Sequence, residues 1–201
     1  MNSFDAENVS RETFEKLKCF AELVRKWNPK INLVSKASLD QIWERHILDS
    51  VQVFQLATGG GHWVDLGSGG GFPGIVIGIL NQEKQKFRVT LVESDQRKCA
   101  FLRTAVRELA LSSDVLNERI EKLDSQQADV LSARALSDLN QLLDFSSMHL
   151  KPYGTALFPK GQNWRKEDQA AREQWSYQCE AVISKTNPAA AILKIKDISR
   201  V

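Results

Sequence analysis

Cysteine is scarce in this chain of 201 residues. The three cysteines, Cys19, Cys99 and Cys179, are odd in number, widely spaced and outside any C-x-x-C pair. This pattern indicates neither a disulfide framework nor a zinc site, so we expect reduced thiols and no bound metal.

Long apolar runs are missing as well. Nowhere do eighteen apolar residues follow one another, and residues 1–11 are polar and charged, without the apolar core of a signal peptide. The sequence therefore predicts a cytoplasmic protein with no membrane segment.

Charge of one sign is not in excess, because 27 Lys and Arg stand against 25 Asp and Glu, a formal net charge of +2. So small a charge neither demands nor excludes a nucleic-acid partner. The hydrophobic content of 42% is enough for one substantial core, whereas two equal domains would be cramped in this length.

What the chain does have is a dense glycine segment at residues 62–74, which reads as a strand, a glycine turn and a helix start. Gly69, Gly71 and Gly74 match the spacing of a dinucleotide fingerprint, which is a weak signal alone. The same segment matches the D-x-G-x-G-x-G loop of S-adenosylmethionine enzymes, beginning at Asp65. We favour this second interpretation, because a carboxylate at the strand end would repel a pyrophosphate but suits a cationic sulfonium ligand.

A second acidic residue supports a nucleoside ligand. The β-branched run 88–93 ends in Glu93, about 20 residues beyond the glycines. A carboxylate there can accept both ribose hydroxyls of an adenosine. It does not distinguish a dinucleotide from S-adenosylmethionine.

Residues 1–57 are expected to form a helical N-terminal cap, and residues 58–201 the glycine-loop domain. Apolar spacing predicts an amphipathic helix that begins near Phe14 and ends at Asn28-Pro29. Ser38 with Gln41 forms a capping box that predicts the start of a second helix.

Strand and helix patterns alternate from residue 62 onward, which predicts an α/β fold with a doubly wound, mostly parallel sheet. The tail looks like a closing antiparallel hairpin around residues 186–188. The expected strands are 62–66, 88–93, 114–118, 128–133, 154–159, 177–185 and 190–197, and the expected helices are 73–81, 95–110, 138–149 and 164–175. Ligands bind beyond the carboxyl ends of such strands, so residues 65–71, 93, 118–121, 134 and 159–161 should converge.

Several motifs together resemble the RsmG (GidB) family, and the resemblance runs from about residue 14 to residue 197 in order. The glycine loop alone would indicate only a class I (Rossmann-like) methyltransferase, whereas R-H-x-x-D-S joined to G-F-P-G is specific to this family. The matching segments are Trp27-Asn28, Asn32-Leu33, residues 45–50, residues 65–74, Ala133-Arg134-Ala135 and Lys160-Gly161.

The resemblance implies a methyltransferase that modifies guanine N7 of 16S ribosomal RNA near the decoding centre, with S-adenosyl-L-methionine as cofactor. It implies that Gly67 and Phe72 line the cofactor site, that Ile120-Glu121 lie beside the adenine, and that Arg134 is on the cofactor. Asp65 and Glu93 join them from the strand-end argument. The full expected set is Asp65, Gly67, Ser68, Gly69, Gly71, Phe72, Glu93, Ile120, Glu121 and Arg134.

Guanine N7 carries a lone pair and no proton, so it can attack a sulfonium methyl once the two are aligned, and positioning is the main task. The sequence shows neither a Pro-Cys nucleophile nor an Asn/Asp-Pro-Pro-aromatic motif, and we expect no catalytic residue. Arg134 and His46 are candidate substrate contacts. His46 and Asp49, three residues apart, could instead form a structural hydrogen-bonded pair.

The expected partner is 16S ribosomal RNA or the small ribosomal subunit, bound by a monomer. Candidate phosphate contacts are Lys160, Arg165, Lys166 and the basic face of helix 95–110, which could also be a solvated surface. The main alternative is a methyltransferase of a small molecule or protein. A nicotinamide oxidoreductase and a non-catalytic ribosome-binding module also remain open.

Overall fold

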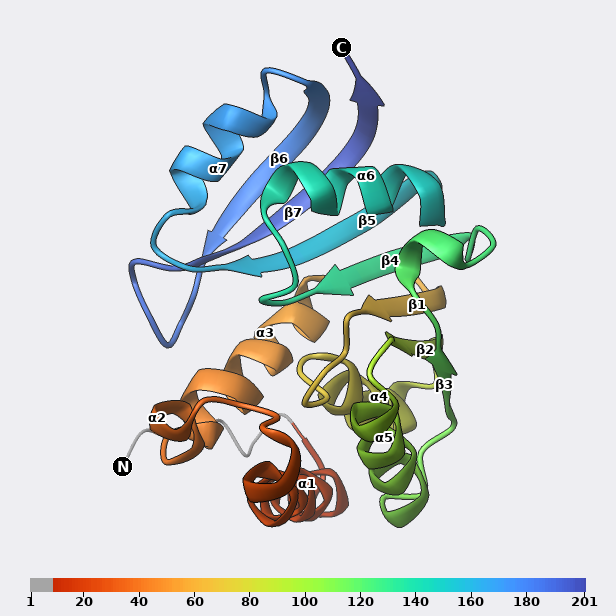
Figure 1. Ribbon diagram of the computed structural model, residues 1–201, viewed down its shortest axis with the longest axis vertical. Helices are drawn as coiled ribbons and strands as arrows, with labels where there is room; N and C mark the ends of the chain where they lie inside the picture. Colours follow the sequence, from red (N-terminus) through yellow and green to blue (C-terminus); the bar gives the residue numbers. More distant parts are fainter. Residues whose placement is uncertain (1–8) are drawn as a thin grey trace.

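The computed structural model describes residues 9–201 and is built around a seven-stranded sheet of order β3-β2-β1-β4-β5-β7-β6 (Figure 1). Strands β1 to β5 pair in parallel, whereas β7 is antiparallel to both β5 and β6. The mostly parallel sheet with an antiparallel C-terminal strand is therefore confirmed. The strands are β1 (Gly61–Leu66), β2 (Phe87–Glu93), β3 (Ser113–Asn117), β4 (Ala128–Ala133), β5 (Leu150–Lys160), β6 (Trp175–Ile183) and β7 (Ala191–Arg200).

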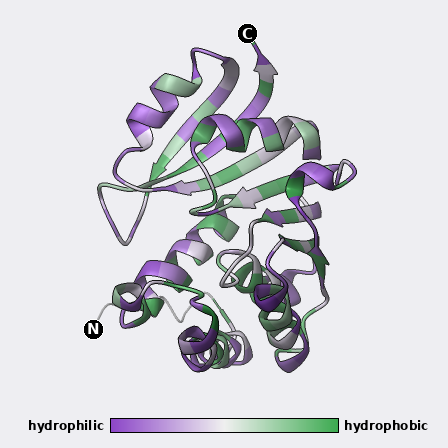
Figure 2. Cartoon of the chain, in the orientation of Figure 1, coloured by the Kyte–Doolittle hydropathy of each residue, from purple (hydrophilic) through white to green (hydrophobic). Residues whose placement is uncertain are grey.

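Helices cover both faces of the sheet (Figure 1). On one face α4 and α5 pack against the strands, and α1 and α3 pack against these helices, while α6 and α7 lie on the other face. Figure 2 shows hydrophobic residues concentrated along the central strands and hydrophilic stretches on α7. The helices are α1 (Arg11–Ile31), α2 (Lys36–Leu39), α3 (Asp49–Leu56), α4 (Gly74–Lys84), α5 (Gln96–Glu108), α6 (Leu139–His149) and α7 (Trp164–Ala171).

The N-terminal helices share one hydrophobic core with the sheet. Phe20 of α1, Ile47 and Val53 belong to the same cluster as Trp63 of β1 and Phe101 of α5. The predicted division between residues 57 and 58 falls in the connection between α3 and β1, and it stays a prediction.

The first helix was expected to end at Asn28-Pro29, which is wrong, because α1 continues to Ile31 with Pro29 inside its last turn. Proline removes one N–H donor and crowds the preceding turn. Two bonds to Asn28 complete this end of the helix: the N–H of Asn32 donates to the Asn28 carbonyl, and the N–H of Val34 donates to Asn28 Oδ1. Asn32 adopts a left-handed conformation and ends the helix.

The second helix is interrupted where a single one was expected. Ser35, not Ser38, is the N-cap of α2, and the short helix ends at Leu39. A π-helical segment, Trp43–Leu48, follows and leads into α3. Such wide turns re-aim side chains and are frequent at functional sites, and this one carries His46.

The C-terminal hairpin of β6 and β7 is confirmed, although β6 spans 175–183 instead of 177–185 and β7 spans 191–200 instead of 190–197. Two neighbouring elements also have shifted boundaries. Helix α7 ends at Ala171 instead of residue 175, because Trp175 is the first residue of β6. Strand β5 begins at Leu150, four residues before its predicted start, with an irregularity in its pairing to β4. Both differences lie away from the carboxyl ends of the strands.

Candidate active site

The glycine loop begins where β1 ends at Leu66 and returns to the start of α4. The N–H of Ser68 donates to the Val92 carbonyl at 3.0 Å, which ties the loop to β2, and the N–H of Gly71 donates to the Ser68 carbonyl at 2.7 Å. Ser68 Oγ donates to the Asp65 carbonyl at 2.9 Å. The loop is thus held rigidly at the topological switch point between β1 and β4, where open parallel sheets bind ligands.

Gly67 shows why the loop requires glycine. Its φ of +62° lies in the left-handed region, and a Cβ built there would approach Leu136 Cδ1 at 2.6 Å. A Cβ at Gly69 would meet only Gly67 O at 3.6 Å and Glu93 Oε2 at 4.0 Å. The loop therefore packs tightly on one side and leaves space on the other.

Asp65 lies beneath the loop. Its side chain is completely buried, and Oδ1 accepts a hydrogen bond from Ser132 Oγ at 2.6 Å, whose oxygen in turn accepts from Trp63 Nε1 at 3.0 Å. Burial raises the pKa of Asp65 to about 6, although the Ser132 hydroxyl opposes that rise. Oδ2 has no hydrogen-bond partner within residues 9–201. Asp65 thus contacts the loop through its backbone carbonyl, whereas its carboxylate is hydrogen-bonded to the neighbouring strand β4.

Glu93 lies at the carboxyl end of β2, as predicted, and both of its oxygens hold the backbone. Oε2 accepts the N–H of Gly69 at 2.9 Å, and Oε1 accepts the N–H of Asp95 at 2.8 Å. Each carboxylate oxygen has a second lone pair. Glu93 can therefore accept hydroxyl groups while it keeps the loop in place.

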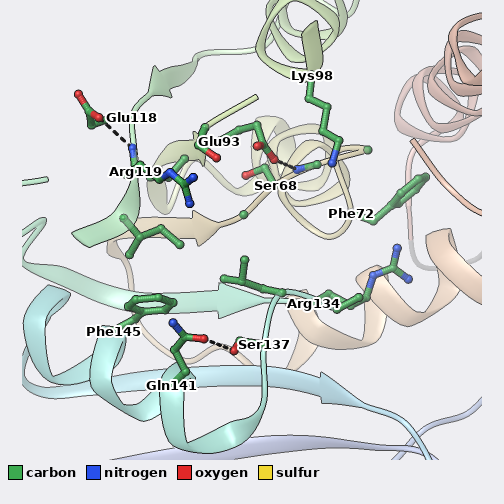
Figure 3. A pocket seen from close by; sticks show the side chains of 18 of the residues that line it. Ser68, Phe72, Glu93, Lys98, Glu118, Arg119, Arg134, Ser137, Gln141 and Phe145 are labelled. Atoms are coloured by element: carbon green, nitrogen blue, oxygen red, sulfur yellow. Dashed lines mark hydrogen bonds between the residues drawn. The ribbon is translucent and has the colours of Figure 1, made fainter. Parts of the chain in front are cut away.

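A first cavity of about 440 Å³ lies above these residues (Figure 3). Figure 3 shows Glu93 and Arg119 on the β2 and β3 side, with Gln141 and Phe145 of α6 across from them. Eight of the ten predicted cofactor residues line this cavity, whereas Asp65 and Gly71 do not. The eight are Gly67, Ser68, Gly69, Phe72, Glu93, Ile120, Glu121 and Arg134.

Sequence reasoning missed the wall opposite the glycine loop. Leu136, Ser137, Gln141 and Phe145 come from the connection between β4 and α6 and from the first turns of α6. Lys98 of α5 was also missed, and it lies on the side of Ser68 and Glu93 (Figure 3). The expectation that ligands bind beyond the carboxyl ends of the strands could have identified residues 136–137. No local pattern singles out Gln141 or Phe145.

A second cavity of about 630 Å³ adjoins the first, and Arg134 and Ala135 line both. Residues 159–161 line this second cavity and not the first, so the predicted convergence divides between two spaces. Arg45, His46 and Asp49 enter it from the π-helical segment and α3. The two cavities thus meet at Arg134.

Arg134, His46 and Phe72 form a cluster at this junction. The Arg134 guanidinium donates to the Arg45 carbonyl at 3.2 Å and to His46 Nδ1 at 2.6 Å, and it lies 5.3 Å from the centre of the Phe72 ring. The His46 ring stacks on Phe72 with centroids 4.9 Å apart. Burial lowers the pKa of Arg134 to about 10, so the guanidinium stays charged at neutral pH.

The same cluster determines the state of His46. Burial and the charges of Arg134 and Arg45 lower the pKa of His46 to about 3, so the imidazole is neutral. A guanidinium only donates hydrogen bonds, so Nδ1 accepts and the proton is on Nε2. Within residues 9–201 this buried Nε2 has no partner. The expected alternative of a His46–Asp49 pair is wrong, because Asp49 accepts hydrogen bonds from Ser184 and Thr186.

Lys160 was expected to hold RNA phosphate, but its ammonium group is already engaged. It forms an ion pair with Glu167 and donates to the Ser137 carbonyl at 3.0 Å.

Within residues 9–201 no group of three or more metal-ligating side chains is found, and no helix there is long and apolar enough to cross a membrane.

Comparison with known proteins decides the family. A family model described as GidB, rRNA small subunit methyltransferase G, matches residues 13–192. The chain belongs to this family. The Ribosomal RNA small subunit methyltransferase G of Ruegeria pomeroyi is 60% identical over 195 residues, which cover 96% of both chains. The same enzyme of another Ruegeria species is 56% identical over 195 residues, covering 96% of this chain and 95% of the relative.

Solved structures agree with this membership at the level of the fold. A SAM dependent methyltransferase from Aquifex aeolicus superposes with a TM-score of 0.61 at 14% identity, covering 87% of this chain and 97% of that one. TYW2 of M. jannaschii, solved in complex with AdoMet, gives 0.59 at 13% identity, with 86% and 80% covered. The class I methyltransferase fold predicted from the motifs of the GidB family is thus confirmed.

Proposed function

We propose that this protein transfers a methyl group from S-adenosylmethionine to N7 of a guanine in small-subunit 16S ribosomal RNA. The observation that carries the proposal is the pair of cavities that meet at Arg134 in a chain of the rRNA small subunit methyltransferase G family. One cavity has the chemistry for the methyl donor, and the other has room for the acceptor nucleotide.

The residues of the first cavity fit S-adenosylmethionine. The open side of Gly69 lets a ligand approach the main chain, Glu93 and Glu121 provide acceptors for ribose hydroxyls, and Ile120 and Phe145 provide apolar surface for an adenine. When bound there, S-adenosylmethionine supplies an electrophilic methyl group. Asp65 and Gly71 would act on this site through Ser68, which lines the cavity and is hydrogen-bonded to both.

The second cavity would position the acceptor base. Guanine N7 needs no base to remove a proton, so the protein has to align it with the methyl group at about 3–3.5 Å before transfer. Arg134 lies where the cavities join, and His46 beside it is neutral and unable to act as an acid at pH 7. Positioning accordingly accounts for the reaction without a catalytic acid or base.

The proposed substrate also indicates where in the cell the enzyme acts. Ribosomal RNA and small subunits are in the bacterial cytoplasm, so we propose a cytoplasmic enzyme. One chain contributes the walls of both cavities, which supports a monomer as the active form.

The test is methyl transfer from labelled S-adenosylmethionine to small ribosomal subunits and to protein-free ribosomal RNA, followed by chemical cleavage at N7-methylguanine. One labelled guanine is expected, and the two substrates show which state of the RNA is recognised. A Gly67→Val variant, whose side chain would clash with Leu136 and displace the glycine loop, serves as the inactive control. Cofactor binding without transfer to either RNA would instead favour a methyltransferase of a small molecule or protein.

A further inference from the structure

Methylation at N7 leaves the choice of purine unexplained. Adenine and guanine both carry an in-plane lone pair at N7, so the alignment that drives the transfer does not distinguish them. The two bases differ at the Watson–Crick edge, where guanine presents the N1–H and N2–H₂ donors and adenine presents an N1 acceptor. The bases differ at C6 as well, where guanine has the O6 acceptor and adenine the N6–H₂ donor. An acceptor for the N1–H and N2–H₂ donors is one way for a site to select guanine.

The second cavity has the size and position to take this base. Its volume of about 630 Å³ is in the range of small-ligand sites, and it shares Arg134 and Ala135 with the first cavity. A base whose N7 faces the shared wall turns its Watson–Crick edge away from that wall. The groups deeper in the second cavity are then the ones that read it.

Two carboxylates line the second cavity, and they differ in what already binds them. Glu167 is paired with Lys160 and accepts the N–H of Leu139 at 3.1 Å. Asp49 takes part in no ion pair within 4 Å among residues 9–201. Both contacts of Glu167 are made by Oε2, and Lys160 balances its charge. Asp49 is thus the carboxylate of this cavity whose charge is not balanced by an ion pair, which makes it the stronger acceptor for a ligand.

The orientation of Asp49 is determined from outside the helix. Oδ1 accepts hydrogen bonds from Ser184 Oγ at 2.9 Å and from Thr186 Oγ1 at 2.5 Å, both in the connection between β6 and β7. Neither hydroxyl neutralises the charge, and within the described chain no hydrogen bond occupies Oδ2. The β6–β7 connection therefore holds a charged acceptor in one orientation at the cavity wall.

We propose that Asp49 is the residue that selects guanine, by accepting hydrogen bonds from N1–H and N2–H₂ of the acceptor base in the second cavity. The inference rests on the proposed transfer to guanine N7. A carboxylate only accepts, so it favours guanine and repels the N1 lone pair of adenine. Enzymes that act on an extruded base commonly read its Watson–Crick edge in this way.

The experiment replaces the methylated guanosine by inosine, which keeps N7, O6 and N1–H and lacks the N2 amino group. Small subunits reconstituted with either base are methylated by the wild-type protein and by Asp49→Asn, and kcat/KM is measured for both. Loss of a hydrogen bond to a charged acceptor predicts a wild-type preference for guanosine of about 10-fold to 100-fold. In Asp49→Asn the preference is expected to fall to about threefold or less, since a neutral acceptor contributes little.

Glu167→Gln is the matched control, because it removes the other carboxylate of the same cavity and should keep the wild-type preference. Binding of S-adenosylmethionine to Asp49→Asn, measured by calorimetry, should be unchanged. If the wild-type protein prefers guanosine over inosine by less than about twofold, the inference is overturned whatever the variant does. An undiminished preference for guanosine in Asp49→Asn would overturn it as well. Absence of transfer to guanosine by the wild-type protein would overturn the proposed function itself, and the inference with it.

Discussion

Replacement of the buried carboxylate Asp65 by asparagine is expected to change how the free energy of unfolding depends on pH. The pKa of Asp65 is raised from 3.8 to about 6 by burial. Below about pH 4 the carboxyl is protonated in the folded and unfolded states, so it has no effect on stability. Between about pH 4 and pH 6 the unfolded chain loses the proton and the folded protein keeps it, so stability falls as pH rises.

The magnitude follows from the two pKa values. Each tenfold change in proton affinity corresponds to about 1.4 kcal/mol, so ionisation of Asp65 lowers the free energy of unfolding by about 3 kcal/mol above pH 6. Asp65→Asn has no charge to bury. The difference in unfolding free energy between the variant and the wild-type protein should therefore rise by about 3 kcal/mol in favour of the variant from pH 4 to pH 7.

Urea denaturation of both proteins at half-unit steps of pH measures this difference, and other titrating groups cancel in the comparison. Ser132→Ala is the companion variant, because loss of the hydroxyl that donates to Asp65 should move the pH window upward. A difference between Asp65→Asn and wild type that stays constant across this pH range would refute the reasoning. It would mean that the folded protein solvates the Asp65 carboxylate as well as water does.

Other expected outcomes concern the cofactor cavity and the cluster beside it. Gly67→Ala should lower the affinity for S-adenosylmethionine about tenfold in calorimetry, because its φ of +62° and the contact with Leu136 displace the loop. Gly59→Ala imposes a similar backbone conformation with no neighbour within 4 Å, and it should leave that affinity unchanged. Glu93→Gln should weaken cofactor binding about tenfold or more, because a charged acceptor of two backbone N–H groups is lost; equal affinities would exclude Glu93 from the site. His46, with a pKa of about 3, should give no inflection in the rate of methyl transfer between pH 5 and pH 8, so an inflection absent from His46→Gln would contradict the assignment.

From residue 62 onward, the local pattern of the sequence was sufficient for the order of strands and helices and for the side of the sheet where the site lies. Alternation of strand and helix patterns predicts a doubly wound sheet, and a ligand site in such a sheet lies beyond the carboxyl ends of its strands. Gly67 and Glu93 follow directly from this rule, because each stands at the end of a strand and both strands are adjacent. The positions of these two residues in the sequence, each at the end of a predicted strand, are therefore enough to predict that they lie at the same edge of the sheet.

Side-chain environment was decided only in the folded protein. Asp65 stands near a strand end like Glu93, yet its carboxylate is fully buried and accepts a hydrogen bond from Ser132, which in turn accepts one from Trp63, and it does not line the cavity. His46 was placed by a π-helical segment that no capping or periodicity signal indicates.

The second cavity likewise needs segments that are far apart in the sequence. Asp49, Arg134 and Thr186 meet there, although more than 130 positions separate the Asp49 carboxylate from the hydroxyls that hold it. Local propensity depends on a residue and its near neighbours, so it predicts helices, strands and turns. Burial, pKa and the partner of a polar group depend on contacts between distant segments, which exist only once the chain has packed.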